Sequence, residues 1–310
     1  MAMSALFFQR LEAQASEQTE TLRIMSFNLW HGGDGGRQPL SQTAKVITEA
    51  KAEVVGLQEI SGFSQQGEAR PDRSLELARL LGWNHLRLNS GALISKYTMV
   101  PQHSLVWGAK LRLPSGKQVY IFNVHLAHAP YQPYQLYQIE YAGAPFLTTE
   151  IEAVQAAKNA RGEQVKHLLN EVKVILSEGL PVFLTGDFNE PSHQDWTSAA
   201  VACGYCRLAV EWPSTKALVD AGFWDAYRLV YPDPVKNRGL TWTPTTSVMD
   251  SKDRHDRIDY IFVYGVINKV LSASIIGESK ENADIVVSPY PSDHRAIVAE
   301  VELQNDAQID

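Results

Sequence analysis

The segment PVFLTGDFNEP (residues 181–191) places two polar side chains directly after a short apolar run. The run Val182–Thr185 is typical of a buried strand, and Gly186 allows the chain to turn at its end. Residues two apart in an extended chain point to the same side, so Asp187 and Asn189 are directed at one spot. A carboxylate beside an amide can bind a hard cation or position a water molecule. Taken alone, the segment favours an Asx turn, in which both side chains bond their own backbone.

The same design recurs along the chain. Strands are predicted over residues 22–29, 53–60, 119–126, 258–264 and 297–303, and each has a polar residue at or next to one end. An acid at the tip of an apolar strand is costly unless it is paired or binds a metal. Because open α/β sheets bind ligands at strand ends, six such segments indicate one shared site. The polar tips are Asn28, Glu59, His125, Asp187, Asn189, Asp259, Asp293 and His294.

The remaining patterns predict helices and loops. Helices are expected over residues 41–52, with Ser41 as the N-cap, and over 73–81, 149–178, 195–202 and 215–221. Residues 258–264 and 266–276 are predicted to pair as a hairpin. Residues 251–257 (SKDRHDR) are interpreted as a solvated turn because they are dense in charge.

Residues 129–146 (APYQPYQLYQIEYAGAPF) form an insertion rich in Pro and Tyr. Its tyrosines are spaced by three and four residues, which places them on one face of a helix and usually means packing. Aromatic insertions beside an active edge also serve as lids or substrate walls. Both interpretations stay open at this point.

Composition restricts the class of protein. The chain has 310 residues, of which 45% are hydrophobic, so it can bury a large core. The net charge of −7 argues against non-specific DNA binding and makes polymeric nucleic acid a less favoured partner. No apolar run approaches the roughly 18 residues of a membrane span. We therefore expect a soluble protein, cytoplasmic by default, or secreted or periplasmic if a leader has been removed. Cys203 and Cys206 form a lone CxxC without a second ligand pair, which predicts neither a zinc site nor a redox motif.

Six motifs in order resemble the endonuclease/exonuclease/phosphatase superfamily, which includes DNase I, AP endonucleases, neutral sphingomyelinases and inositol polyphosphate 5-phosphatases. They are SFNLW (26–30), GLQEI (56–60), NVHL (123–126), GDFN (186–189), RIDYI (257–261) and SDH (292–294). The resemblance implies an α/β (α+β) fold, a four-layer α/β/β/α sandwich with two packed mixed β-sheets. It implies a single domain over residues 22–304, preceded by a polar tail over residues 1–21, with residues 129–146 as an aromatic insertion or lid.

The resemblance also implies roles for the polar tips. Glu59, Asn28 and Asp293 are expected to bind a divalent metal, Mg²⁺ with Mn²⁺ or Ca²⁺ as competitors, because the ligands are oxygens. Asp187 and Asn189 are expected to orient the attacking water and the phosphate. Asp259 is expected to orient His294. His125 occupies a position where AP endonucleases have Tyr, which argues against an abasic-site enzyme.

Other residues have weaker assignments. His31, His128, Tyr131 and Arg228 are predicted substrate contacts. His85, His103, His167 and His193 are expected to be ordinary surface or core histidines, and His255 is expected in solvent.

The sequence therefore predicts a metal-dependent phosphoester hydrolase. A phosphodiesterase acting on a small or lipid-like ester is favoured. The alternatives are a DNase-like nuclease, a phosphomonoesterase of sugar or inositol phosphates, and a catalytically silent binding domain.

Overall fold

Two mixed β-sheets form the centre of the computed structural model, which describes residues 20–64, 67–100, 105–265 and 267–304. Residues 1–19 of the predicted tail over residues 1–21 lie outside these ranges, as does His103, whereas Thr21 already belongs to the first strand. The first sheet has the strand order β12-β11-β13-β1-β2-β4-β3, and the second has the order β5-β6-β7-β8-β10-β9.

The first sheet consists of β1 (Thr21–Asn28), β2 (Val54–Gln58), β3 (Asn84–Leu88), β4 (Gly91–Ser95), β11 (Ile267–Gly277), β12 (Ile285–Val286) and β13 (Ala296–Leu303). The second consists of β5 (Thr98–Val100), β6 (Gly108–Arg112), β7 (Gln118–His125), β8 (Val182–Asp187), β9 (Trp224–Asp225) and β10 (Asp259–Tyr264). The α-helices are α1 (Leu40–Glu49), α2 (Arg73–Leu81), α3 (Gln132–Tyr137), α4 (Glu150–Ile175), α5 (Ser198–Ala202), α6 (Pro213–Asp220) and α7 (Ala226–Val230). Two short 3₁₀ helices are η1 (His31–Gly33) and η2 (Leu176–Glu178).

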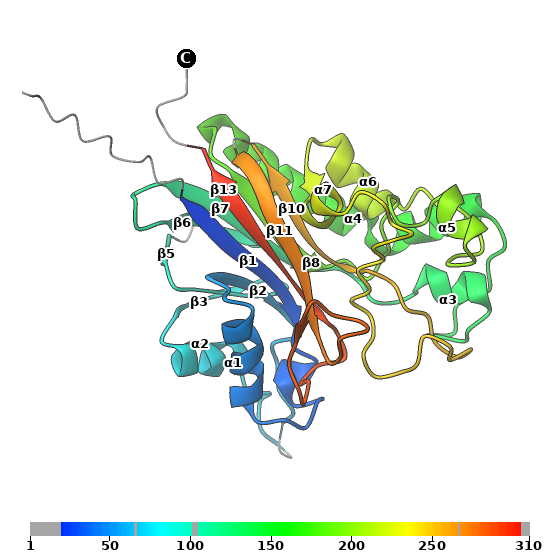
Figure 1. The fold of residues 1–310 in the computed structure, drawn as a ribbon, viewed down its shortest axis with the longest axis horizontal. Helices are drawn as coiled ribbons and strands as arrows, with labels where there is room; N and C mark the ends of the chain where they lie inside the picture. Colours follow the sequence, from blue (N-terminus) through cyan, green and yellow to red (C-terminus); the bar gives the residue numbers. More distant parts are fainter. Residues whose placement is uncertain (1–19, 65–66, 101–104, 266, 305–310) are drawn as a thin grey trace, which may run out of the picture.

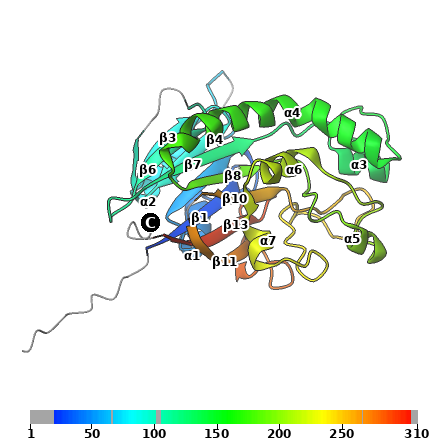
Figure 2. The ribbon, with the colours of Figure 1, turned by 90° about the horizontal axis from the view of Figure 1, so that it is seen from above.

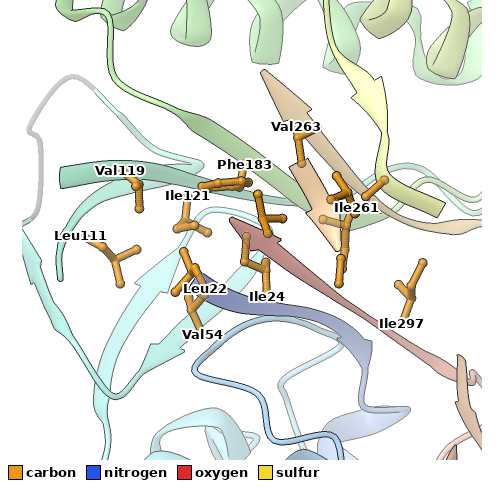
Figure 3. Packing of buried hydrophobic residues seen from close by; sticks show 14 of the residues in the cluster. Leu22, Ile24, Val54, Leu111, Val119, Ile121, Phe183, Ile261, Val263 and Ile297 are labelled. Atoms are coloured by element: carbon orange, nitrogen blue, oxygen red, sulfur yellow. The ribbon is translucent and has the colours of Figure 1, made fainter. Parts of the chain in front are cut away.

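Side-chain alternation along the strands builds four layers. In β1, Leu22 and Ile24 face the second sheet, whereas Met25 and Phe27 pack toward α1 and α2. Figure 3 shows Leu22 and Ile24 beside residues of the second sheet such as Phe183. The outer face of the second sheet is covered by α4, which runs along it in Figure 2. The predicted α/β/β/α sandwich is confirmed. The central strands β1, β2, β7, β8 and β10 are buried on both faces, which explains their nearly continuous apolar runs.

Two local predictions are wrong. Helix α1 begins at Leu40 after Pro39, and no side chain caps it, so Ser41 lies inside the helix. The predicted hairpin of residues 258–264 with 266–276 does not form, because β10 pairs with β8 and β9 whereas β11 pairs with β13 and β12. Between β10 and β11 the chain passes from one sheet to the other. Apolar periodicity identified both strands but carries no information about their partners.

The charged segment 251–257 is not a solvated turn, because its second half is buried. Arg257 forms ion pairs with Asp195 at 2.9 Å and with Asp225 at 2.7 Å. Asp256 accepts a hydrogen bond from the indole of Trp196 at 3.0 Å. These partners come from distant parts of the chain. The interpretation as a solvated turn was wrong because the charges of this segment pair with side chains that are far away in sequence.

Within the described residues, no helix combines the length and the apolar character needed to cross a lipid bilayer.

Candidate active site

Strand register brings three candidate side chains to one level of the second sheet. Asp187 is the last residue of β8, and it stands opposite Asp259 of β10 in the antiparallel pair. In the parallel pair of β7 and β8, His125 stands beside Asp187. From the first sheet, the side-chain amide of Asn28 at the end of β1 donates to Asp187 Oδ2 at 2.9 Å. Ends of strands from both sheets therefore meet at one edge.

The buried carboxylate of Asp187 contacts most of the other candidate residues. Its Oδ1 accepts the backbone N–H of Asn189 at 2.8 Å. Nε2 of His125 lies 3.5 Å from Oδ2, and Nε2 of His294 lies 3.7 Å from the same oxygen. Only half of the Asx turn considered from the sequence is formed, through Oδ1 of Asp187, because the side-chain amide of Asn189 donates to the distant carbonyl oxygen of Leu126 at 3.1 Å. Oδ2 of Asp187 remains directed at the two imidazoles.

His294 and Asp259 form a buried pair in which Nδ1 lies 2.9 Å from Oδ2. Burial alone would lower the pKa of His294, but Asp259 and Asp187 raise this pKa to about 10. The imidazole therefore carries a proton at neutral pH, and its Nδ1–H donates to Asp259. The ring of Trp242 packs at an angle against His294 with a centroid distance of 4.9 Å, which fixes the orientation of the imidazole.

Glu59 and Asp293 line the same cavity as these residues. Glu59 directly follows β2 and accepts the backbone N–H of His31 at 3.2 Å and the amide of Asn28 at 3.4 Å. Burial raises the pKa of Asp293 to about 7; His294 opposes this rise, whereas Glu59 adds to it. Among the described residues, the buried Oδ1 of Asp293 has no hydrogen-bond partner. A divalent cation near the two carboxylates would relieve their repulsion and satisfy this oxygen.

A second group of ligand atoms is less suited to a metal. One atom each of Asp187, Asp259 and His294 lies within 4.8 Å of the others. However, Oδ2 of Asp259 is engaged by Nδ1 of His294, and a protonated imidazole cannot bind a cation. The oxygen donors of Glu59, Asp293 and Asn28 fit a hard ion such as Mg²⁺ better.

These polar residues lie in a cavity of about 700 Å³ whose wall includes part of the 129–146 insertion. Tyr131, Tyr134 and Tyr141, here called the tyrosine wall, contact one another edge to face, with centroid distances of 4.9 and 5.6 Å. The hydroxyl of Tyr131 donates to Asp256 at 2.9 Å, and that of Tyr134 donates to Asp253 at 2.5 Å. Tyr137 instead packs against Trp196. The insertion therefore both packs and lines the cavity.

Most predicted substrate contacts reach the cavity, with one exception. His31, His128 and Tyr131 line it. The prediction for Arg228 is wrong, because this side chain is buried elsewhere and donates to Asp195 at 2.7 Å and to the carbonyl oxygen of Asn237 at 2.8 Å. A buried acid on another segment holds the guanidinium, which the sequence could not indicate.

The other histidines in the described part of the chain lie outside the cavity. His85 bonds to Ser74, His193 bonds to Thr215, and His167 is exposed on α4. His255 was expected in solvent, but it is buried and bonds to Thr246 at 3.0 Å. Cys203 and Cys206 are free thiols.

Trp242 and Arg70 line the cavity but were not predicted from the sequence. Tyr134 and Tyr141 were not named as substrate contacts, but they belong to the insertion for which a substrate wall was one of the two interpretations. Trp242 and Arg70 lie in irregular segments, where side-chain spacing does not predict direction.

The sequence model of the Endonuclease/Exonuclease/phosphatase family matches residues 25–294 of this chain, a range that includes every polar tip. The chain belongs to this family. As a member, it is a phosphoester hydrolase that uses a divalent metal. An uncharacterized protein of Caenorhabditis elegans is 28% identical over 299 residues, with 90% of each chain covered.

Solved structures show the same fold at low sequence identity. The endonuclease/exonuclease/phosphatase from Beutenbergia cavernae is 18% identical with a TM-score of 0.57, covering 92% of this chain and 72% of that one. Truncated TDP2 of Caenorhabditis elegans is 19% identical with a TM-score of 0.53, covering 91% and 97%. Danio rerio TDP2, solved in complex with a single-stranded DNA product, is 16% identical with a TM-score of 0.52, covering 91% and 99%.

Proposed function

We propose that this family member is a Mg²⁺-dependent phosphodiesterase that hydrolyses a small diester by in-line attack of water. The observation that carries the proposal is the imidazole of His294, held at 2.9 Å by Asp259, beside the carboxylate of Asp187 and in one cavity with Glu59 and Asp293. A diester needs a water molecule that loses a proton and donors that stabilise charge on the phosphoryl oxygens. This arrangement supplies both.

Each side chain has a role in the reaction. Asp187, oriented by Asn28 and by the backbone of Asn189, accepts the proton of the attacking water as the new P–O bond forms. His294 donates from Nε2–H to a phosphoryl oxygen, where negative charge grows in the transition state. His125 contributes the second imidazole, and its buried Nε2 has no hydrogen-bond partner among the described residues. The bond from phosphorus to the leaving oxygen breaks on the side away from the water.

Glu59, Asp293 and Asn28 are the proposed metal ligands. When bound there, Mg²⁺ supplies Lewis-acid stabilisation of the charge on the phosphate and the leaving oxygen. Two observations support this placement: Glu59 and Asp293 repel each other, and Oδ1 of Asp293 has no hydrogen-bond partner among the described residues.

The cavity supports a small substrate rather than a lipid or a polymer. Its volume of about 700 Å³ suits a molecule of metabolite size. Aromatic rings supply most of its apolar lining, and Ile60 and Ile258 are the aliphatic side chains. Stacked rings suit a planar group, whereas acyl chains would favour a longer aliphatic groove.

A nuclease is the second candidate, and the tyrosine wall is the observation that favours it, because aromatic side chains can stack nucleobases. Danio rerio TDP2, which shares the fold, was solved with a single-stranded DNA product. Salt dependence separates the two. Cleavage of a polymer should fall steeply with ionic strength, and hydrolysis of a small ester should not.

The test is hydrolysis of bis(4-nitrophenyl) phosphate, with 4-nitrophenyl phosphate as the monoester comparison. The wild-type protein should cleave the diester faster than the monoester and only with Mg²⁺ or Mn²⁺. His294→Ala should lower kcat on the order of 10²–10⁴-fold, whereas the control His167→Ala, on the exposed face of α4, should not. Equal background rates in wild type and His294→Ala would contradict the proposal and favour a silent binding domain. A faster reaction with the monoester would instead support a phosphomonoesterase.

A further inference from the structure

Arg70 lies in the active-site cavity but takes no part in the proposed reaction. Its Nε donates to the carbonyl oxygen of Gly62 at 2.8 Å, and its Nη2 donates to that of Ser61 at 2.7 Å. Nη2 also lies 3.1 Å from Nδ1 of His31. The guanidinium is therefore held in one orientation, while no hydrogen bond to a described residue uses its Nη1.

The Arg70 contact orients the imidazole of His31. A guanidinium only donates hydrogen bonds, so Nδ1 of His31 accepts in this contact and Nε2 is the ring nitrogen that can donate. Nη1 of Arg70 and Nε2 of His31 have no hydrogen-bond partner among the described residues, and both residues line the cavity.

The loop that carries Arg70 is anchored at its base. Ser61 and Asp72 form an antiparallel bridge, and the N–H of Gly62 donates to Pro71 at 3.0 Å. Next to Gly62, the N–H of Phe63 donates to Asp34 Oδ2 at 2.8 Å. The carbonyl oxygens of Ser61 and Gly62 that orient Arg70 therefore belong to anchored backbone, which lowers the entropy lost when Arg70 binds a ligand.

The charge of Arg70 is not neutralised in the way that nearby arginines are. Arg87, which also lines the cavity, has Asp72 at 2.6 Å. Arg73 pairs with Asp34 and Glu76. Among the described residues, no carboxylate lies within ion-pair distance of Arg70. A positive group that is held by neutral acceptors and faces a cavity is suited to bind an anion from outside the chain.

We propose that Arg70 and His31 form a subsite for a second phosphate group, carried by the substrate in addition to the phosphate that is cleaved. This inference rests on the proposed phosphodiesterase function and specifies its substrate class. The substrate is a small phosphodiester with a planar group for the tyrosine wall and one further phosphate. Arg70 and His31 act here as binding residues and take no part in bond breaking.

Two matched substrates test the subsite. They are the 4-nitrophenyl ester of thymidine 5′-phosphate, with and without a phosphate on the 3′ oxygen, and 4-nitrophenol release gives kcat/KM for each. The wild-type protein should prefer the doubly phosphorylated ester. Arg70→Met should reduce this preference on the order of 10–100-fold, which is the usual effect of losing a charge-assisted hydrogen bond. Arg70→Lys should keep part of the preference, because it retains the charge but not the planar fork.

Arg112→Met is the matched control, because Arg112 is exposed on β6 and lies outside the cavity, and this change should leave the preference unaltered. If Arg70→Met does not fold, competition with wild-type protein decides. Thymidine 3′,5′-bisphosphate should inhibit more strongly than thymidine 5′-phosphate.

The outcomes separate the two proposals. Hydrolysis of both esters without a preference, equal inhibition by the two nucleotides, or an unchanged preference in Arg70→Met would overturn the subsite and leave the phosphodiesterase intact. Hydrolysis of neither ester would overturn the phosphodiesterase, and the subsite with it.

Discussion

Replacing Asp259 with Asn removes a charge 2.9 Å from Nδ1 of His294 while keeping the shape of the side chain. The wild-type pKa of His294 is about 10, so at about pH 7.5 protonated imidazoles outnumber neutral ones on the order of 300 to 1. In Asp259→Asn, burial, which lowers the pKa of His294, is opposed mainly by Asp187. We expect the pKa to fall far enough for neutral imidazole to predominate, and kcat to fall on the order of 10²–10⁴-fold.

The assay is the pH dependence of bis(4-nitrophenyl) phosphate hydrolysis with saturating Mg²⁺. The wild-type rate should fall at alkaline pH as His294 loses its proton, and this fall should move to lower pH in Asp259→Asn. If the Asp259→Asn variant loses activity at the same alkaline pH as the wild type and keeps a kcat within about threefold of it, the proposed role of the His294–Asp259 pair is refuted.

The same shift predicts a pH-dependent stability for the metal-free protein. The pKa of His294 is higher in the folded protein than its ordinary value of 6.5, so the folded state holds a proton that the unfolded chain has released. This stabilisation is complete below pH 6.5 and is lost as the pH rises through about 10. Urea unfolding of wild type in EDTA should therefore show a loss of stability across this range that is smaller in Asp259→Asn. Identical pH dependence of the stability in the two proteins would contradict the assignment of this effect to the raised pKa of His294.

Three further predictions concern the supports of the site. Arg161→Met should lower the free energy of unfolding by about 3–5 kcal/mol, because it leaves the buried carboxylate of Glu190 without its partner at 3.0 Å; a change below about 1 kcal/mol in urea titrations would contradict this. Asp256→Asn should raise KM for an aromatic ester more than it lowers kcat, because Tyr131 loses a charged acceptor at 2.9 Å; a loss confined to kcat would be inconsistent with a binding wall. Adding Mg²⁺ to the metal-free protein should raise its melting temperature, and the rise should be smaller in Asp293→Asn; an equal rise in both would place the ion elsewhere.

The sequence predicted the candidate site residues that lie at the ends of strands. Asp187, Asp259 and His125 were predicted to meet because each lies at the tip of an apolar run, and the register of β7, β8 and β10 places them at one level. Such a prediction works because side chains along a strand alternate with a period of two, so the side to which a residue at the strand end points follows from the sequence.

Long-range pairing of charges was not predictable. The segment around Arg257 looked solvated because its neighbours in sequence are charged, whereas its partners Asp195 and Asp225 lie far away along the chain. The same limit explains the wrong assignment of Arg228, which is held by Asp195. Arg70 was missed for a related reason, because backbone carbonyl oxygens orient it and these leave no pattern in the sequence.

The most direct test of the account is the position of the metal. Crystals soaked with Mn²⁺ should show one anomalous peak coordinated by carboxylate oxygens of Glu59 and Asp293, with Nδ1 of His294 still bonded to Asp259. A peak bound instead by Asp187, Asp259 and His294 would contradict the proposed roles of these residues, because His294 would then be a metal ligand and could not carry the proton on which the proposed reaction depends.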